Sequence, residues 1–420
     1  MSEINTSQLR EEVNPVFTTA RSCLQITGAT GDEDSKKLLG ILGFDDLHNA
    51  KVSRAVPAEQ AKLVKQLVPA FFSQVEVRFA VTNEIIKALG VKNVLDLPCG
   101  YTPRGIKLAK SGIKYYGCDL PAVIDEIAPA VKKVIGGNEN IRYTAVDATN
   151  YDSLKAALGD AEGELFITTE GMLMYFTQNE LEEVFTNIRR LLTEYGGRWV
   201  TCDSTLMNLQ KEIIGAVMGV SPDDGKAFAS IGRMAAVAMS DTEQAANLFF
   251  DKDIEKVKKF ISDMGFEMSV ISAGDHLPET MYSLAPLPED RQKAAREVIS
   301  KMDFWVLTPK SDAAEVDIRE QKEFRAVMKR DGSRLAFGLS GRLDTITATD
   351  LLALYRKAEG EGNISSVRVD CSELQYVSSA GLRVLMIMHK SGGGVTLTNV
   401  SDGVTEILET TGFLGILKTE

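Results

Sequence analysis

The sequence has few of the residues that metal centres, disulfide frameworks and proton-transfer sites usually require. Its 420 residues include only three histidines and five cysteines. The cysteines are scattered and form no C-x-x-C pair, which argues against a zinc site and against a disulfide framework. We therefore expect reduced, mostly buried thiols and no metal.

Long apolar runs and an excess of basic residues are also missing. No run approaches the ~20 apolar residues that span a bilayer, and the stretch MSEINTSQLREEVNP lacks the charged-then-apolar plan of a signal peptide. We expect a cytoplasmic protein without a membrane partner. Lys and Arg number 47 against 59 Asp and Glu, for a net charge of -12. Nucleic acid is not an expected partner, because neutralising its phosphates takes clustered basic side chains.

The composition is otherwise that of a globular protein, with 44% hydrophobic and 25% charged residues. The length favours two or more domains. Hydrophobic periodicity predicts a helical segment first, then short strands alternating with helices, then a polar linker and a smaller α/β unit. The predicted segments are 1–90, 91–308, 309–322 and 323–420.

Strands that alternate with helices predict a parallel sheet covered by helices on both faces. The last two strands of this region, FEMSVISAG and FWVLTPK, are expected to close the sheet with an antiparallel edge. A methionine-rich helical insert lies near 206–250. Methionine adapts to irregular apolar space, so this insert either packs in the core or forms a substrate lid.

The stretch VLDLPCGYTPRGIKLAKSGIKYYGCDL holds the first indication of a ligand. A strand ends in a turn at Pro98 and Gly100, a helix follows, and a second strand ends at Asp119. In nucleotide-binding α/β sheets this arrangement places a small-residue turn under the ligand and an acid beside the ribose hydroxyls. The pattern predicts an adenosine-containing ligand.

The glycine pattern bears on which adenosine ligand is bound. A dinucleotide favours G-x-G-x-x-G, which lets a pyrophosphate approach the backbone. Here Gly100 and Gly105 are present, but Tyr101 and Pro103 crowd the turn. S-adenosylmethionine has no phosphate and tolerates this crowding, so we favour it as the cofactor.

Four segments in order, VLDLPCGYTPRG, YYGCDLPAVI, AVDATN and TTEGMLMYFTQNEL, carry a family resemblance. Residues 70–205 resemble S-adenosylmethionine-dependent methyltransferases of the leucine carboxyl methyltransferase type. The resemblance implies a Rossmann-like class I fold with a mostly parallel seven-stranded sheet. Thr102 or Pro103 stands where the family has an acidic residue.

The resemblance also implies which residues bind the cofactor. Asp119 would bind the ribose, and Arg78 and Arg104 would lie near the cofactor carboxylate, where a guanidinium forms a two-pronged charged pair. Tyr175 either contacts the sulfonium through its ring or packs in the core. The other implied residues are Asp147 and Ala148 at the adenine, Glu170 and Gly171 at the methionine half, and Asp96, Pro98, Gly100 and Leu120 around the first two strand ends.

The last hundred or so residues resemble a different family. The segments LSGRLDTITATDLL, VRVDCSELQYVSSAGLRVLMIMHK and VTEILETTGFLGIL resemble a STAS domain, the fold of anti-sigma-factor antagonists. Strands are expected at RLAFGLSGRLD, SSVRVDCSEL and GVTLTNV. The resemblance implies a kinase or anti-sigma-like partner and phosphorylation at Ser379, with Ser378 in place of the usual aspartate. Alternatively, one of these serines only caps the helix.

Two functions remain open from the sequence. The first is an O-methyltransferase that acts on a carboxyl or hydroxyl group of a small molecule or peptide, joined to a STAS interaction domain. The second is a sensor that binds adenosyl ligands without catalysis and signals through the STAS domain. Methyl transfer is a direct displacement that depends mainly on alignment, and no catalytic residue is assigned.

Overall fold

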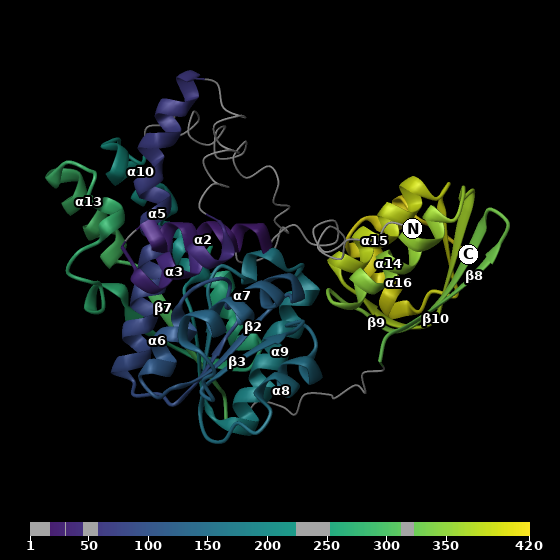
Figure 1. Cartoon of the computed structure of the whole chain (residues 1–420), viewed down its shortest axis with the longest axis horizontal. Coiled ribbons are helices and arrows are strands. Elements are labelled where there is room, and N and C mark those ends of the chain that lie inside the picture. Colours follow the sequence, from purple (N-terminus) through teal and green to yellow (C-terminus); the bar gives the residue numbers. More distant parts are fainter. Residues whose placement is uncertain (1–16, 30, 45–57, 224–252, 312–322) are drawn as a thin grey trace. The chain divides into compact units, whose positions relative to one another are not determined.

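The computed structural model describes residues 17–29, 31–44, 58–223, 253–311 and 323–420 (Figure 1). The chain divides into two compact units, the larger within residues 16–314 and the smaller within 315–420. Parts of three predicted segments lie outside the described residues: 1–16 and 45–57 of the first helical segment, 224–250 of the insert and 312–322 of the linker. Within the described ranges, no helix has both the length and the apolarity that a bilayer crossing demands.

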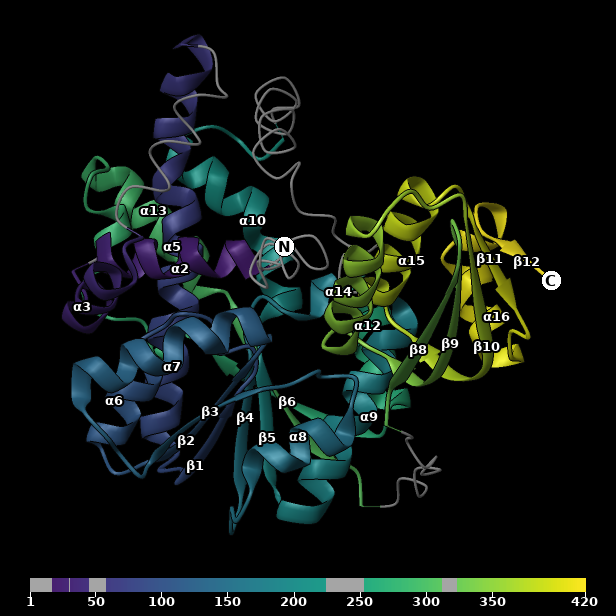
Figure 2. The ribbon, with the colours of Figure 1, turned by 45° about the vertical axis from the view of Figure 1, so that its right-hand side comes forward.

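The larger unit is built on a seven-stranded sheet of order β3-β2-β1-β4-β5-β7-β6. Figure 2 labels the strands β1 to β6 of this sheet. The strand β7 runs antiparallel to both of its neighbours, and the other pairings are parallel. The predicted α/β class with a mostly parallel, Rossmann-like sheet is therefore confirmed. The strands are β1 (Asn93–Asp96), β2 (Lys114–Asp119), β3 (Ile141–Ala145), β4 (Leu165–Thr169), β5 (Gly197–Thr201), β6 (Phe266–Ser272) and β7 (Asp303–Pro309).

The last two strands pair antiparallel at one edge of the sheet, as expected, but not in chain order. The strand β7 lies between β5 and β6, and β6 forms the edge. Burial explains this order: the residues from Phe304 to Leu307 in β7 are all buried, whereas β6 is mostly half-buried or exposed. A continuously apolar strand belongs inside a sheet, because both of its faces are covered there.

Helices cover both faces of this sheet and bury two separate cores. One core contains side chains from α2, α3, α5, α6, α7, α10 and α13, and the other contains side chains from α8, α9 and α12. The helices are α2 (Phe17–Ala29), α3 (Glu33–Leu42), α5 (Ala58–Ala88), α6 (Arg104–Lys110), α7 (Pro121–Ile135), α8 (Tyr151–Leu158), α9 (Gln178–Tyr195), α10 (Asp203–Met218), α12 (Ile254–Asp263) and α13 (Glu289–Ser300). Short 3-10 helices are η1 (Leu173–Tyr175), η3 (Ala273–Asp275) and η4 (Tyr282–Leu284).

The smaller unit is a five-stranded sheet of order β12-β11-β10-β9-β8 with its own apolar core. The first two strands form an antiparallel hairpin, and the remaining pairings are parallel. Its elements are β8 (Arg325–Asp331), β9 (Arg334–Leu343), α14 (Thr347–Gly360), β10 (Ser366–Val377), α15 (Ser379–Ser391), β11 (Val395–Thr398), α16 (Asp402–Thr410), η5 (Phe413–Gly415) and β12 (Lys418–Thr419).

Candidate functional site

The predicted residues of the larger unit gather where three parallel strands end. The strands β2, β1 and β4 are neighbours in the sheet, so their carboxyl ends lie at the same edge. Asp96 is the last residue of β1, Asp119 is the last residue of β2, and Glu170 follows β4 directly. In open α/β sheets this edge is where ligands bind.

The turn after β1 is fastened to the end of β2. It begins with a cis peptide bond between Leu97 and Pro98, and Gly100 has a φ of +54°, which suits glycine because it lacks a Cβ. The Gly100 N–H donates to Asp119 Oδ2 at 2.7 Å. The turn therefore lies where the sequence predicts it, directly beside the acid.

Asp119 is a buried carboxylate held in a fixed orientation. It is 7% exposed, and its Oδ1 accepts the Leu120 N–H at 2.7 Å. Burial raises the pKa of Asp119 to about 7, although the two backbone N–H groups oppose this. Each carboxylate oxygen has a further lone pair, so Asp119 can accept hydrogen bonds from two more donors.

Arg104 lies at the centre of a buried network. It is 2% exposed, and Nη1 lies 2.9 Å from Asp96 Oδ1 while Nη2 lies 2.5 Å from Glu170 Oε1. Its Nε donates to Asn83 Oδ1 on α5 at 3.0 Å. Burial works against its charge, but the Asp96 and Glu170 carboxylates raise the pKa of Arg104 overall. Arg104 thus ties α5 and α6 to the ends of β1 and β4.

Arg78 on α5 is a second guanidinium at this edge and, unlike Arg104, it is not held by ion pairs within the described ranges. Gly171 has a φ of +70°, and a Cβ placed there would come within 2.8 Å of Arg78 Nη1, so the two residues pack closely. Among the residues that the structure describes, no hydrogen bond or ion pair involves the Arg78 side chain. Arg78 is half-buried, and burial works to lower its pKa, but nearby groups that include the Glu170 and Asp203 carboxylates raise the pKa overall. Its guanidinium keeps N–H donors that an anion can use.

Asp203 completes the site, although no sequence pattern predicts it. Its carboxylate accepts the backbone N–H groups of Gly171, Met172 and Leu173 at 2.6, 2.9 and 2.9 Å. These bonds fix the turn that follows Glu170. Burial raises the pKa of Asp203, while the three N–H donors oppose the shift. Its position just beyond β5, in the string VTCDS, is the signal that could have identified it.

The residues predicted at the adenine are already bonded within the protein. Asp147 Oδ1 accepts the Thr149 N–H at 2.8 Å and the Thr149 hydroxyl at 2.6 Å. The Ala148 carbonyl accepts from Asn187 Nδ2 at 3.0 Å. Asp147 and Ala148 follow β3, which neighbours β2. Tyr175 ends the 3-10 helix η1 and is half-buried.

The two serines of the smaller unit have different surroundings. Ser378 is 1% exposed and is the N-cap of α15, where its Oγ accepts the Gly381 N–H at 3.2 Å. Its own N–H donates to the Leu343 carbonyl at 2.9 Å. Ser379 is the first residue of α15 and is exposed. Ser378 therefore caps the helix, and Ser379 is the serine presented to solvent.

Metal ligands do not gather in the described part of the chain: no group of three or more His, Cys, Asp or Glu side chains there is arranged to hold an ion. The described cysteines are free thiols. Burial raises the pKa of Cys99 and of Cys202, so both thiols stay neutral near pH 7.

A family model matches residues within the smaller unit. The family model described as "Mlab, STAS domain" matches residues 327–418. No curated protein matches the sequence.

Solved structures similar to parts of the chain fall into two groups. A DUF574 family protein from Streptomyces avermitilis is 13% identical, with 60% of this chain and 89% of that chain covered and a TM-score of 0.36. An O-methyltransferase family protein from Burkholderia thailandensis is 12% identical, with coverages of 58% and 59% and a TM-score of 0.33. An anti-sigma factor antagonist from Mycobacterium paratuberculosis is 15% identical, with coverages of 23% and 85% and a TM-score of 0.21.

The predicted resemblance of the C-terminal part to STAS domains is confirmed by the family model. For the larger unit, the predicted class I sheet is confirmed by its strand order and by the one antiparallel strand among those described.

Proposed function

We propose that the larger unit is an S-adenosylmethionine-dependent O-methyltransferase and that the smaller unit binds, or is regulated by, a protein partner. The observation that carries the proposal is a pair of side chains at one edge of a class I sheet. Asp119 is a buried acceptor, and Arg78 is a cation with no hydrogen bond or ion pair in the described part of the chain, although the nearby Glu170 and Asp203 carboxylates interact with its charge. A ribose and an amino acid carboxylate are the groups that these two side chains suit.

The protein's residues fit both ends of this cofactor. Asp119 Oδ1 and Oδ2 would accept the ribose hydroxyls, because each oxygen has one described donor at 2.7 Å and a further lone pair. The Arg78 guanidinium would form a two-pronged pair with the cofactor carboxylate.

The remaining predicted residues would border the cofactor between these two ends. The turn at Gly100 would lie under the ligand, with Pro98 and Leu120 beside it. Asp147 and Ala148 would border the adenine, since both follow the strand next to β2.

Arg104 takes a different role in this proposal from the one that the family resemblance implies. Three of its five N–H donors are used by Asn83, Asp96 and Glu170. We assign Arg104 to hold Glu170 and Asp96 in place, and we leave the cofactor carboxylate to Arg78.

The methionine half of the cofactor would then lie against the turn after β4. Glu170 and Gly171 would border it, and Tyr175 would lie in the next turn. The bonds from this turn to Asp203 keep its backbone in one conformation, so that the surface offered to the ligand is preformed.

When bound, S-adenosylmethionine supplies an electrophilic methyl group on a sulfonium. The protein has to align an acceptor oxygen with that methyl and exclude water. A carboxylate acceptor is already ionised at neutral pH and needs no base. Neutral Cys99 and Cys202 do not serve as bases, and His389 Nδ1 accepts the Val395 N–H within the smaller unit. A carboxyl acceptor therefore makes the smallest demand on the described residues, and it is the acceptor that we propose.

The test is product formation with matched acceptors. The full chain is incubated with S-adenosylmethionine and pairs of small carboxylic acids and their corresponding alcohols, and S-adenosylhomocysteine is measured. We expect product with an acid and little with its alcohol. Asp119→Asn should abolish most of it, whereas Asp152→Asn, which changes an exposed acid on α8, should not.

The alternative function gives a distinct result. A sensor would bind S-adenosylmethionine and form no product with any acceptor tried, including a fractionated metabolite extract. Absence of both binding and product would overturn the proposal altogether.

For the smaller unit, the proposal rests on Ser379. It is exposed at the first residue of α15, where a helix N-terminus stabilises negative charge. Phosphorylation there would add roughly two negative charges to the surface that a partner contacts. A kinase or an anti-sigma-like protein is the kind of partner that this arrangement suits.

Phosphopeptide mapping of the protein isolated from its native source tests this assignment. We expect phosphate on Ser379, because the Ser378 side chain is buried and already bonded. Ser379→Asp should change the capture of a partner protein and leave S-adenosylhomocysteine binding intact. Phosphate on Ser378 alone would contradict the assignment.

A further inference from the structure

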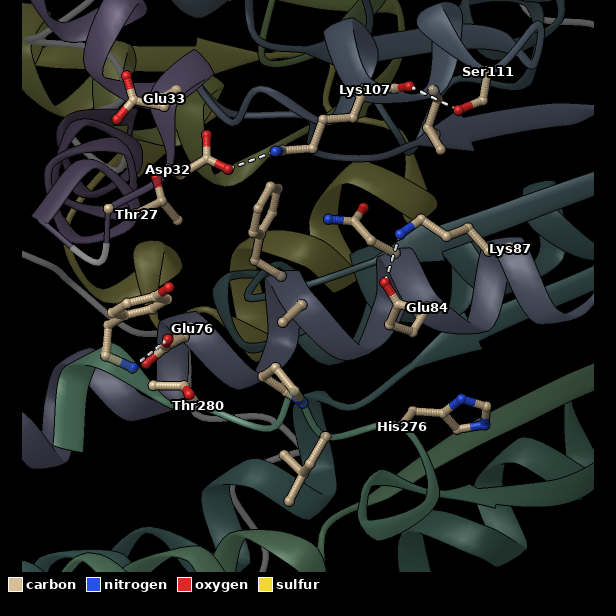
Figure 3. A pocket seen from close by; sticks show the side chains of 18 of the residues that line it. Thr27, Asp32, Glu33, Glu76, Glu84, Lys87, Lys107, Ser111, His276 and Thr280 are labelled. Atoms are coloured by element: carbon tan, nitrogen blue, oxygen red, sulfur yellow. Dashed lines mark hydrogen bonds and ion pairs between the residues drawn. The ribbon is translucent and has the colours of Figure 1, made fainter. Parts of the chain in front are cut away.

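A cavity of about 900 Å³ lies in the larger unit, apart from the residues assigned to the cofactor (Figure 3). Its walls come from Thr27 on α2, from Gly31 and Asp32 just before α3, from α5 and α6, and from the segment that follows β6. The volume lies within the range of small-molecule sites, which are mostly apolar and carry a few directed polar groups.

Helix α5 presents a row of side chains to this cavity. Residues four apart share a helix face, and Phe79, Asn83 and Lys87 form such a row in the lining. The guanidinium of Arg104 lies 5.5 Å from the centroid of the Phe79 ring. Leu108 on α6 adds apolar surface. Phe79 is 9% exposed and Leu108 is 2% exposed, so the cavity offers the edge of an aromatic ring and a small aliphatic contact.

Asn83 lines the cavity with a side-chain amide. It is 7% exposed, and its Oδ1 is occupied by Arg104 Nε. Its Nδ2 makes no hydrogen bond with any residue in the described ranges. The amide N–H₂ group is therefore free to donate to a ligand oxygen in the cavity.

The charges around the cavity largely neutralise one another. Lys87 pairs with Glu84 at 2.6 Å, and Lys107 pairs with Asp32 at 2.5 Å (Figure 3). The lining has five acidic residues and three lysines, a difference of two negative charges. This balance disfavours an anion.

We propose that this cavity binds an uncharged, planar small molecule that carries a carbonyl oxygen. The ring lies against Phe79, and the oxygen accepts from Asn83 Nδ2. Arg104 lies between this site and the cofactor edge, because it contacts both Asn83 and Glu170. Binding at this cavity does not require methyl transfer. It can therefore be tested independently of the proposed function.

Benzamide is the probe, and ligand-observed NMR on the full chain without cofactor is the measurement. Benzamide should bind the wild type. Ala80→Trp, which fills the cavity from α5, should remove the signal, and Leu89→Trp, beyond the end of α5 and outside the lining, should keep it. Thr280→Trp fills the cavity from an exposed position on another wall and replaces Ala80→Trp if that variant does not fold.

Benzoate tests the predicted ligand class. Because the lining is net negative, benzoate should bind at least about threefold more weakly than benzamide. Equal or tighter binding of benzoate would overturn the assignment of an uncharged ligand. An unchanged benzamide signal in the cavity-filled variants, or no benzamide signal in the wild type, would overturn the site itself.

Discussion

The guanidinium of Arg104 and the carboxylate of Glu170 form a buried ion pair, with Nη2 and Oε1 2.5 Å apart. The pair joins α6 to the end of β4, and Asp96 joins β1 to the same guanidinium. Buried charges of this kind depend on each other, because a carboxylate left without its partner in the interior is strongly unfavourable. The shape of the candidate site therefore depends on a residue that need not contact any ligand.

Removing Arg104 should destabilise the larger unit. Arg104→Met leaves Asp96 and Glu170 without their shared cation, and we expect a loss of roughly 3–5 kcal/mol in the free energy of unfolding. Urea unfolding followed by tryptophan fluorescence measures it, because both tryptophans, Trp199 and Trp305, belong to the larger unit.

The control is Lys258→Met, which removes a surface pair with Glu255 on α12. Exposed pairs contribute at most about 1 kcal/mol, so this variant should unfold close to the wild-type midpoint. Equal midpoints for Arg104→Met and the wild type would mean that the buried network contributes nothing to stability.

Cofactor affinity should depend on pH near neutrality. The pKa of Asp119 is about 7 because of burial, and the ribose hydroxyls need the ionised form as acceptor. Affinity for S-adenosylhomocysteine should therefore fall by up to about tenfold for each pH unit below 7. Calorimetric titrations at pH 6, 7 and 8 give the profile, and Asp119→Asn should flatten it. A wild-type affinity that stays constant over this range would count against the role of the ionised carboxylate.

Ionisation of Asp119, which should strengthen cofactor binding, should weaken the folded protein. The pKa of Asp119 is higher in the folded protein than the ordinary value of 3.8, so the folded state binds the proton more tightly than the unfolded state. The stabilisation is complete below about 3.8 and is lost as the pH rises through about 7. In unfolding measurements across pH 5 to 8, Asp119→Asn should lose less stability than the wild type. A parallel loss in both proteins would contradict the raised pKa.

Much of the fold is predictable from local patterns. The small-residue turn at Gly100 and the acid at Asp119 follow from strand ends and spacing, and both lie where the sequence indicates. The order of the last two strands is not predictable in the same way. Both runs are short and apolar, and only the continuous burial of β7 places it inside the sheet.

Other parts of the structure depend on contacts that a local pattern does not report. Asp203 holds a turn some thirty residues earlier in the chain. The sequence marks Arg104 as a site residue, but whether it faces a ligand or three protein groups depends on Asn83 and Glu170. The sequence prediction also misses β8, although Gly332 begins the two-residue turn that joins β8 to β9.

The two serines of the smaller unit should differ in hydrogen exchange. Ser378→Ala removes the acceptor of the Gly381 N–H, and losing an N-cap costs about 0.5–2 kcal/mol. Amide exchange in the first turn of α15, followed by mass spectrometry, should become faster. Ser379→Ala should leave the amide exchange nearly unchanged. Faster exchange in Ser379→Ala but not in Ser378→Ala would contradict the assignment of Ser378 as the helix cap.

The central claim is that Asp119 binds the ribose of an adenosyl ligand, and calorimetric titration with S-adenosylhomocysteine at pH 8 tests it most directly. The wild type should bind, Asp119→Ala should bind more weakly by about 1.5–3 kcal/mol, and Asp152→Ala should bind like the wild type. Equal affinity of Asp119→Ala and the wild type, or no binding by either, would contradict the account.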